Sequence, residues 1–218
     1  MSSTALWYAT RATGLTALIL FTVTMVLGLV TATRSRSHAW PGFARQELHR
    51  RLSILAVVFL VLHVATSVLD TYVDIGWIAA VVPFTSGYDS LWVGVGAVSL
   101  DLMIAVFVSS LLRSRIRPGT WRAVHWLAYV SFPVALAHTF ALGTDSRQPW
   151  VIALGLSCVL AVVIALTVRV VGAQRQTAVR LDVLATSGTS AKHLARPTTA
   201  PARQPRHHAL RHDALGHG

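Results

Sequence analysis

Four histidines lie in two apolar segments of the chain, at spacings that suit binding of a metal cofactor. His49 and His63 are fourteen residues apart, and His125 and His138 are thirteen apart. At about 1.5 Å of rise per residue, each pair spans roughly 20 Å along a helix. Two such helices side by side offer facing imidazoles at two depths, and haem iron takes histidine as an axial ligand. The pattern predicts two bis-histidine haem sites in which all four histidines bind haem iron.

Other chemistry is open to these residues. Two axial histidines leave no free position on the iron, which favours one-electron transfer. Histidines in membrane helices also form helix–helix hydrogen bonds or serve transporters and proton relays. The alternative is therefore a haem-free small membrane transporter or scaffold with structural histidines. The helix geometry of the second pair also counts against haem binding. On an ideal helix, thirteen residues place His138 roughly 140° around the axis from His125, so the two rings point in different directions. Both could point toward the partner helix only if Pro133, which lies between them, rewinds or kinks the helix.

The histidines need membrane-spanning helices to position them. The chain has 218 residues, of which 54% are apolar and 12% charged, as is typical of polytopic membrane proteins. Its apolar runs predict an all-α bundle of about five transmembrane helices, each able to cross ~30 Å of hydrocarbon. The first run lacks a basic segment before it, so we expect a retained helix and not a signal peptide. The predicted helices cover residues 6–31, 48–69, 91–112, 121–142 and 150–171.

Domain organisation and orientation follow from composition and charge. Residues 1–172 are expected to form one membrane domain, and the polar residues 173–218 a disordered, basic cytoplasmic tail. The first and third loops are rich in arginine and the second is acidic, so the positive-inside rule puts the N-terminus outside the plasma membrane and the C-terminus in the cytoplasm. Topology thus explains the +11 charge without nucleic acid. The single cysteine, Cys158, excludes an internal disulfide and C-x-x-C-H attachment, so any haem is non-covalent.

Three arginines are candidates for contact with haem propionates, because arginine forks match carboxylates. Arg11 lies near the start of the first helix, where a snorkelling role is the alternative. Arg50 and Arg122 lie beside His49 and His125, where topology alone would explain them. Asp101, in the middle of the third helix, could pair with Arg11 or take part in proton transfer.

Several segments together resemble the ferric reductase-like transmembrane domain. That family includes NADPH oxidases, ferric reductases and the haem-binding membrane subunit of a bacterial methionine sulfoxide reductase system. The likeness covers roughly residues 7–171, including its histidine spacings, and implies two b haems, with His49 paired to His125 and His63 to His138. The segments that carry it are Leu48-His49-Arg50-Arg51-Leu52, Leu62-His63-Val64, Trp121-Arg122-Ala123-Val124-His125-Trp126-Leu127-Ala128-Tyr129 and Ala137-His138.

The chain departs from the oxidases after its last predicted helix. They continue into a flavin and nicotinamide domain, whereas residues 173–218 are too few for one and no G-x-G-x-x-G follows a strand. We therefore expect an oxidoreductase component in the lipid bilayer that receives electrons from a separate flavoprotein or a quinol. The alternative within the family is a haem-binding membrane subunit dedicated to one soluble reductase.

Overall fold

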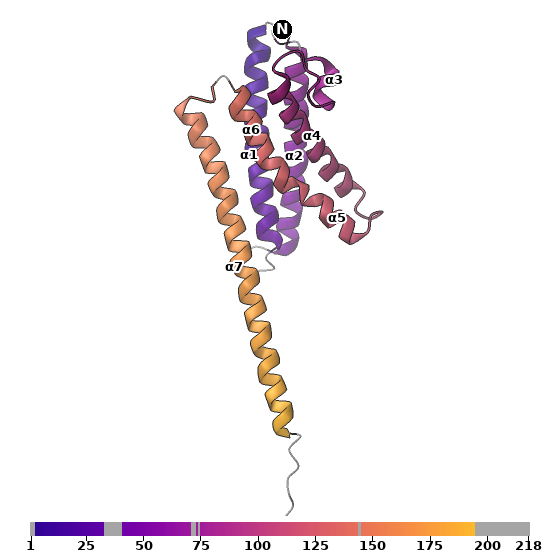
Figure 1. Cartoon of the computed structure of the whole chain (residues 1–218), viewed down its shortest axis with the longest axis vertical. Coiled ribbons are helices and arrows are strands. Elements are labelled where there is room, and N and C mark those ends of the chain that lie inside the picture. The colour runs from indigo at the N-terminus through magenta and orange to yellow at the C-terminus, as the bar shows by residue number, and fades with distance from the viewer. Residues whose placement is uncertain (1–2, 33–40, 71–72, 74, 144, 195–218) are drawn as a thin grey trace, which may run out of the picture. The chain divides into compact units, whose positions relative to one another are not determined.

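Helices account for nearly all of the structure. The computed structural model describes residues 3–32, 41–70, 73, 75–143 and 145–194, and in these ranges it contains helices and no strand (Figure 1). The predicted all-α class is therefore confirmed. The helices are α1 (Ser3–Ala32), α2 (Gly42–Leu69), α3 (Gly76–Val81), α4 (Ser90–Leu111), α5 (Pro118–His125), α6 (Leu127–Leu142) and α7 (Pro149–Leu194).

Four of these helices are long and apolar enough to cross a membrane, by length and composition: α1, α2, α4 and residues Pro149–Ala178 of α7. Many large apolar side chains on their surfaces are exposed, among them Val61 and Leu160. A helix satisfies its own backbone hydrogen bonds, which is what hydrocarbon surroundings require. The protein is an all-α membrane bundle, as the apolar runs predict.

The helix predicted over residues 121–142 is two helices, which corrects that expectation. α5 ends at His125 and α6 begins at Leu127. At the junction the N–H of Tyr129 bonds to the carbonyl of Trp126 at 3.0 Å, a three-residue closure tighter than that of an α-helix. Pro133 lies inside α6 without ending it. His125 and His138 are therefore on separate helices. The rotation of roughly 140° between them, expected for a single straight helix, does not apply.

The last helix is longer than predicted. α7 continues past residue 171 to Leu194, through the first half of the segment expected to be disordered. That part contains four alanines and three leucines, which favour helix, and no proline. The chain divides into two compact units, Met1–Gln174 and Arg175–Gly218, so α7 belongs to both. Residues 195–218 of the predicted tail lie outside the described residues.

Two helix pairs hold the first unit together. α1 packs along α2, and α4 packs along α6 (Figure 1). Since lipid is as apolar as the side chains, close packing and interhelical hydrogen bonds favour such contacts more than the hydrophobic effect does. α1, α6 and the first part of α7 meet in a buried cluster of Leu18, Phe21, Met25, Leu29, Phe132, Leu136, Cys158 and Ala165.

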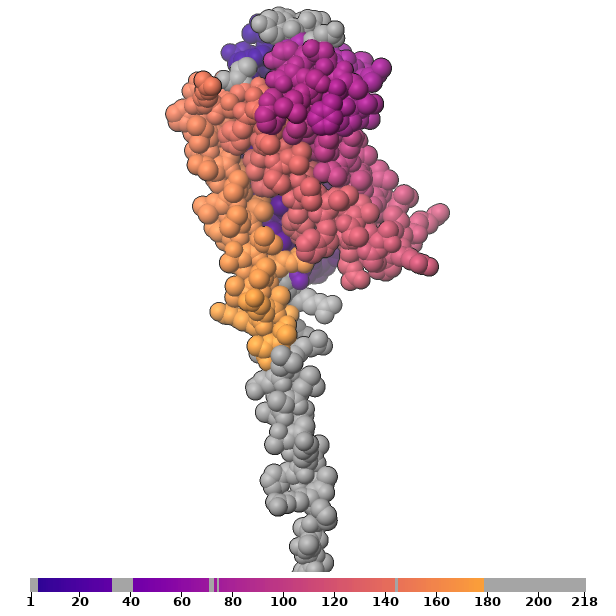
Figure 2. Space-filling model, viewed as in Figure 1, coloured from indigo at the N-terminus to yellow at the C-terminus, as the bar shows by residue number. Residues whose placement is uncertain are grey.

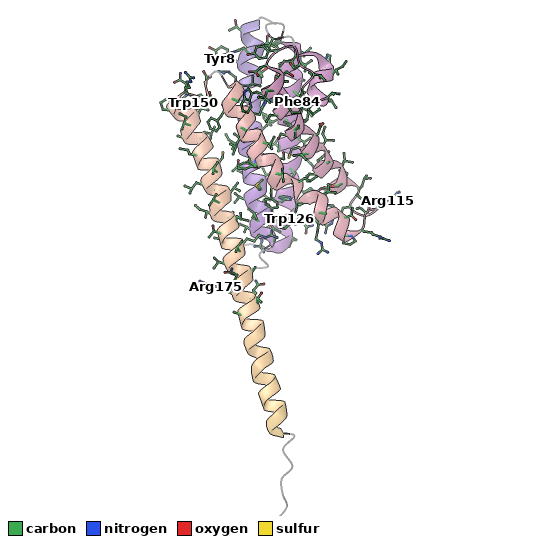
Figure 3. The ribbon with its side chains drawn as sticks, viewed as in Figure 1. Tyr8, Phe84, Arg115, Trp126, Trp150 and Arg175 are labelled. Atoms are coloured by element: carbon green, nitrogen blue, oxygen red, sulfur yellow. The ribbon has the colours of Figure 1, made fainter. Side chains whose placement is uncertain are left out.

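Exposed aromatic side chains mark the two ends of this unit. Tyr8, Phe84 and Trp150 lie toward one end, and Trp126 lies toward the other (Figure 3). On the face shown in Figure 2, the segment containing α3 lies at the first of these ends. Aromatic rings of this kind are enriched where hydrocarbon meets headgroups, so their placement agrees with a membrane-spanning unit.

Candidate bis-histidine sites

The structure brings the four histidines together in two pairs. The ring centroids of His49 and His125 are 6.4 Å apart, and those of His63 and His138 are also 6.4 Å apart. α2 provides His49 and His63, α5 ends with His125, and α6 carries His138. We refer to these as the 49/125 pair and the 63/138 pair. All four side chains are half-buried.

Backbone carbonyls orient three of the four rings. Nδ1 of His63 donates to the carbonyl of Thr10 at 2.8 Å, and Nδ1 of His49 to that of Thr24 at 3.0 Å, both on α1. Nδ1 of His138 donates to the carbonyl of Trp92 on α4 at 2.8 Å. A carbonyl only accepts, so the proton is on Nδ1 and Nε2 keeps a free lone pair. Metal-binding histidines nearly always donate their other ring N–H in this way, to a carboxylate, a backbone carbonyl or water.

Glycines make room for the same three rings. A Cβ built on Gly14 would lie 2.8 Å from Nδ1 of His63, and one on Gly96 would lie 2.5 Å from Nδ1 of His138. A Cβ on Gly28 would lie 3.2 Å from Cε1 of His49. Each glycine follows the accepting carbonyl by four residues, one helical turn. Because the helix surface has no side chain there, the imidazole can reach the backbone.

The spacing of the rings suits one metal ion between each pair. Imidazole nitrogen binds metals at about 2 Å, so imidazoles on opposite sides of one ion have centres roughly 6 Å apart. Both pairs meet this condition. The 63/138 pair also borders a mainly apolar cavity of about 350 Å³, within the size range of cofactor pockets. The residues present therefore fit haem, which would be held by His63 with His138 and by His49 with His125.

His125 is oriented by different contacts. Its Nδ1 is buried and has no hydrogen-bond partner among the described residues. Its ring instead stacks on that of Trp121, one turn earlier in α5, with centroids 5.0 Å apart and planes at 26°. The guanidinium of Arg113 lies 4.5 Å from the Trp121 ring centre. His125 thus contacts the Trp121 ring, with the Arg113 cation beyond it, where the other three histidines bond to a backbone carbonyl.

Arg11, one of the three arginines predicted to contact haem propionates, lies beside a histidine pair. It lines the cavity at the 63/138 pair, forms an ion pair with Asp145, and has its guanidinium carbon 4.1 Å from the Trp7 ring centre. Asp145 was not among the residues predicted for the site, since it lies in the turn before α7. The sequence suggested Asp101 as a partner for Arg11, and Asp101 is half-buried within α4.

The other predicted arginines lie on the surface. Arg50 is exposed, and Arg122 is exposed with its Nε donating to the carbonyl of Pro118 within α5. Sequence reasoning treated Arg45 only as a loop charge, yet it is buried in the first turn of α2. It precedes His49 by four residues, which puts both on one face of the helix. The four-residue spacing of Arg45 and His49 could therefore have been recognised from the sequence alone.

One comparison with known proteins identifies a family. Residues 5–145 match the family model described as "Domain of unknown function (DUF8596)". The chain belongs to the DUF8596 family. No curated protein and no solved structure matches it.

The DUF8596 match covers both histidine pairs. It begins within α1 and ends at Asp145, the partner of Arg11. It therefore includes the three glycines and the three accepting carbonyls, and it leaves out α7. The residues that bring the histidines together therefore all lie inside the DUF8596 region.

Proposed function

We propose that this protein transfers electrons across a membrane through two b-type haems, each held by one histidine pair. One observation carries the proposal. Two separate pairs of imidazoles have the same 6.4 Å spacing, and three of the four rings have Nε2 left free by an Nδ1 bond to a carbonyl. Helix–helix hydrogen bonding by structural histidines would not require two pairs of rings with the same spacing.

Haem supplies one-electron chemistry, and the chain supplies position and surroundings. The histidines of α2 set two depths about fourteen residues apart, which corresponds to roughly 20 Å. Apolar side chains of α1 and α6, among them Leu18, Phe21 and Phe132, lie along the chain between these depths.

Loop charges support the direction in which the helices are inserted. Basic side chains in and beside the loops at the 49/125 end include Arg45, Arg50, Arg51, Arg113, Arg115, Arg117 and Arg122, with one carboxylate, Glu47. The described loop residues at the other end carry the carboxylates Asp70, Asp89 and Asp145 and one arginine, Arg147. By the positive-inside rule we place the 49/125 pair near the cytoplasm and the 63/138 pair near the exterior of the plasma membrane.

The electron donor in this proposal is a separate flavoprotein or a quinol. The exposed arginines near the 49/125 pair would attract an acidic protein surface, so reduction by a cytoplasmic protein should slow as salt rises. Dithionite should reduce both haems, and NADPH alone should reduce neither. Rapid reduction of the purified chain by NADPH would contradict a separate donor.

Haem stoichiometry tests the central proposal. The purified protein should contain two b haems per chain by the pyridine haemochrome assay, both low-spin. His63→Ala should reduce this to one haem, and His49→Ala should also reduce it to one. His207→Ala, in the C-terminal segment, is the matched control and should keep both. Protein that binds no haem would favour the alternative, a haem-free membrane protein with structural histidines.

A further inference from the structure

Trp121 has a buried hydrogen-bond donor for which the described residues provide no acceptor. Its ring nitrogen, Nε1, is buried and has no hydrogen-bond partner in the part of the chain that the structure describes. An indole N–H can only donate, and a buried tryptophan N–H usually finds an acceptor, because burying it unbonded costs its hydration. This donor is therefore available to a bound group.

The Trp121 ring lies at the 49/125 pair. It stacks on the ring of His125, with centroids 5.0 Å apart and planes at 26°. Because an indole N–H points along the plane of its own ring, this stacking does not use it. Trp121 also precedes His125 by one turn of α5, so it is the nearer of the two to the arginine-rich loop at residues 112–117. The free donor thus lies beside a candidate haem ligand, on the side of the loop.

Positive charge next to the Trp121 ring favours an anion as the acceptor. The guanidinium carbon of Arg113 is 4.5 Å from the ring centre. The carboxylate in the first turns of α2, Glu47, is exposed and accepts a hydrogen bond from Nε of Arg51 at 2.7 Å. An anion bound beside Trp121 would therefore gain the attraction of the Arg113 cation, and Glu47 is already bonded elsewhere.

Haem b has groups that match this donor. The hydrogen-bond acceptors at the edge of its ring are two propionate carboxylates, and charged groups are less costly at the aqueous end of a site than in hydrocarbon. The sequence suggested Arg50 and Arg122 as propionate contacts at this pair. Both are exposed, and Nε of Arg122 donates to the carbonyl of Pro118 within its own helix.

We propose that Nε1–H of Trp121 donates to a propionate of the haem held by the 49/125 pair, with the charge of Arg113 beside it. This inference rests on the proposed function. Two axial histidines leave the porphyrin free to rotate about the line that joins them through the iron. A bond from Trp121 to one edge of the porphyrin fixes that rotation. Trp121 is then a cofactor-binding residue, in addition to orienting His125 by stacking.

The rate of haem loss tests this assignment in a His63→Ala background, which retains only the haem of the 49/125 pair. Trp121→Phe keeps an aromatic ring against His125 and removes the N–H. Haem should then transfer to an excess of apomyoglobin about tenfold faster or more, because hydrogen bonds to charged acceptors are among the stronger ones. Trp126→Phe is the matched control, since Trp126 is next to the same histidine but exposed, and it should leave the rate unchanged.

A porphyrin without propionates separates binding from packing. The apoproteins are reconstituted with an iron porphyrin that carries ethyl groups in place of both propionates. The Trp121→Phe protein and its parent should lose this porphyrin at the same rate. Equal acceleration with both porphyrins would show that Trp121 only packs against His125. That result, or an unchanged rate of haem loss, would overturn this inference and leave the proposed function standing.

A second substitution covers the case in which Trp121→Phe does not fold. Benzothienylalanine at position 121 keeps the size and shape of the indole and replaces its N–H by sulfur, so packing is retained. It should also speed the loss of haem and not that of the propionate-free porphyrin. Haem loss at the parental rate would overturn the assignment. A parent protein that binds no haem would overturn the proposed function as well.

Discussion

At the scale of single residues, Gly96 is the position where an added methyl group would most disturb a histidine. A Cβ there would lie 2.5 Å from both Nδ1 and Cε1 of His138, closer than real contacts allow. In Gly96→Ala the ring must move and lose its bond to Trp92. We expect the haem content to fall from two to one per chain, with an overpacking cost of about 1–3 kcal/mol in unfolding free energy. Haemochrome assay and thermal unfolding in detergent measure the two effects.

The control for this change is a glycine with open space around it. Gly172 in α7 has nothing within 4 Å of a built Cβ. Gly172→Ala should therefore keep both haems and full stability. If Gly96→Ala also keeps both haems, the close approach of His138 to α4 is not needed for cofactor binding.

At the scale of helices, Ser99 and Ser131 join α4 to α6 at mid-depth. Their hydroxyls are 3.0 Å apart, and each also lies within hydrogen-bond distance of the other's carbonyl. Both side chains are buried. A double-mutant cycle of Ser99→Ala and Ser131→Ala should give a coupling of about 0.6 kcal/mol, and at most roughly 1.7 kcal/mol, as such bonds do between membrane helices. Unfolding free energies in mixed micelles measure it.

The exposed Ser157 provides the matched comparison for that cycle. Ser157→Ala combined with Ser131→Ala should be additive, because Ser157 is exposed and bonds to the carbonyl of Leu154 within α7, so the two side chains share no partner. A coupling near zero for Ser99 with Ser131 would show that the hydroxyl pair does not hold α4 to α6.

Helix ends were predictable where hydropathy alone determines them. Long apolar runs give both ends of α1 and α4 within about three residues, since the pattern is local. The end of α2 at Leu69 was also predicted, but α2 begins at Gly42 and not at Leu48, because hydropathy does not detect its polar first turns. The break at Trp126 was not predictable, because it depends on how α5 and α6 align with α4. α7 extends further than expected because helix-forming residues continue after the apolar run ends. The short α3, six residues long, has too few residues for a periodic signal.

The candidate site was predictable in part, because residue type and spacing are local features of the sequence. Residue type and spacing select the four histidines, and the structure places them in two pairs with ring centroids 6.4 Å apart. The carbonyl partners are backbone atoms, which no residue type reveals. The glycines did leave a signal, since Gly14 and Gly28 repeat the spacing of His49 and His63. That signal has meaning only once α1 is known to pack along α2.

At the scale of the whole molecule, orientation in the membrane can be measured directly. In a Cys158→Ala background, Thr85→Cys places a thiol in the segment before α4, and Ser114→Cys places one in the arginine-rich loop after it. Both positions are exposed. From the positive-inside rule, a membrane-impermeant maleimide added to intact cells should label Thr85→Cys and not Ser114→Cys. Permeabilised cells, in which both thiols should react, are the control, and the reverse pattern in intact cells would invert the proposed orientation.

The bonds between Nδ1 and the helix carbonyls also bear on the order of assembly in the cell. They join His49 and His63 to α1, and His138 to α4, through protein atoms alone. These imidazoles are therefore aligned as soon as the helices associate, and no porphyrin is needed as a template. We expect the newly inserted polypeptide to fold first and to be loaded with haem afterwards. Cells starved of haem should accordingly accumulate a protease-resistant apoprotein that matures when haem is restored.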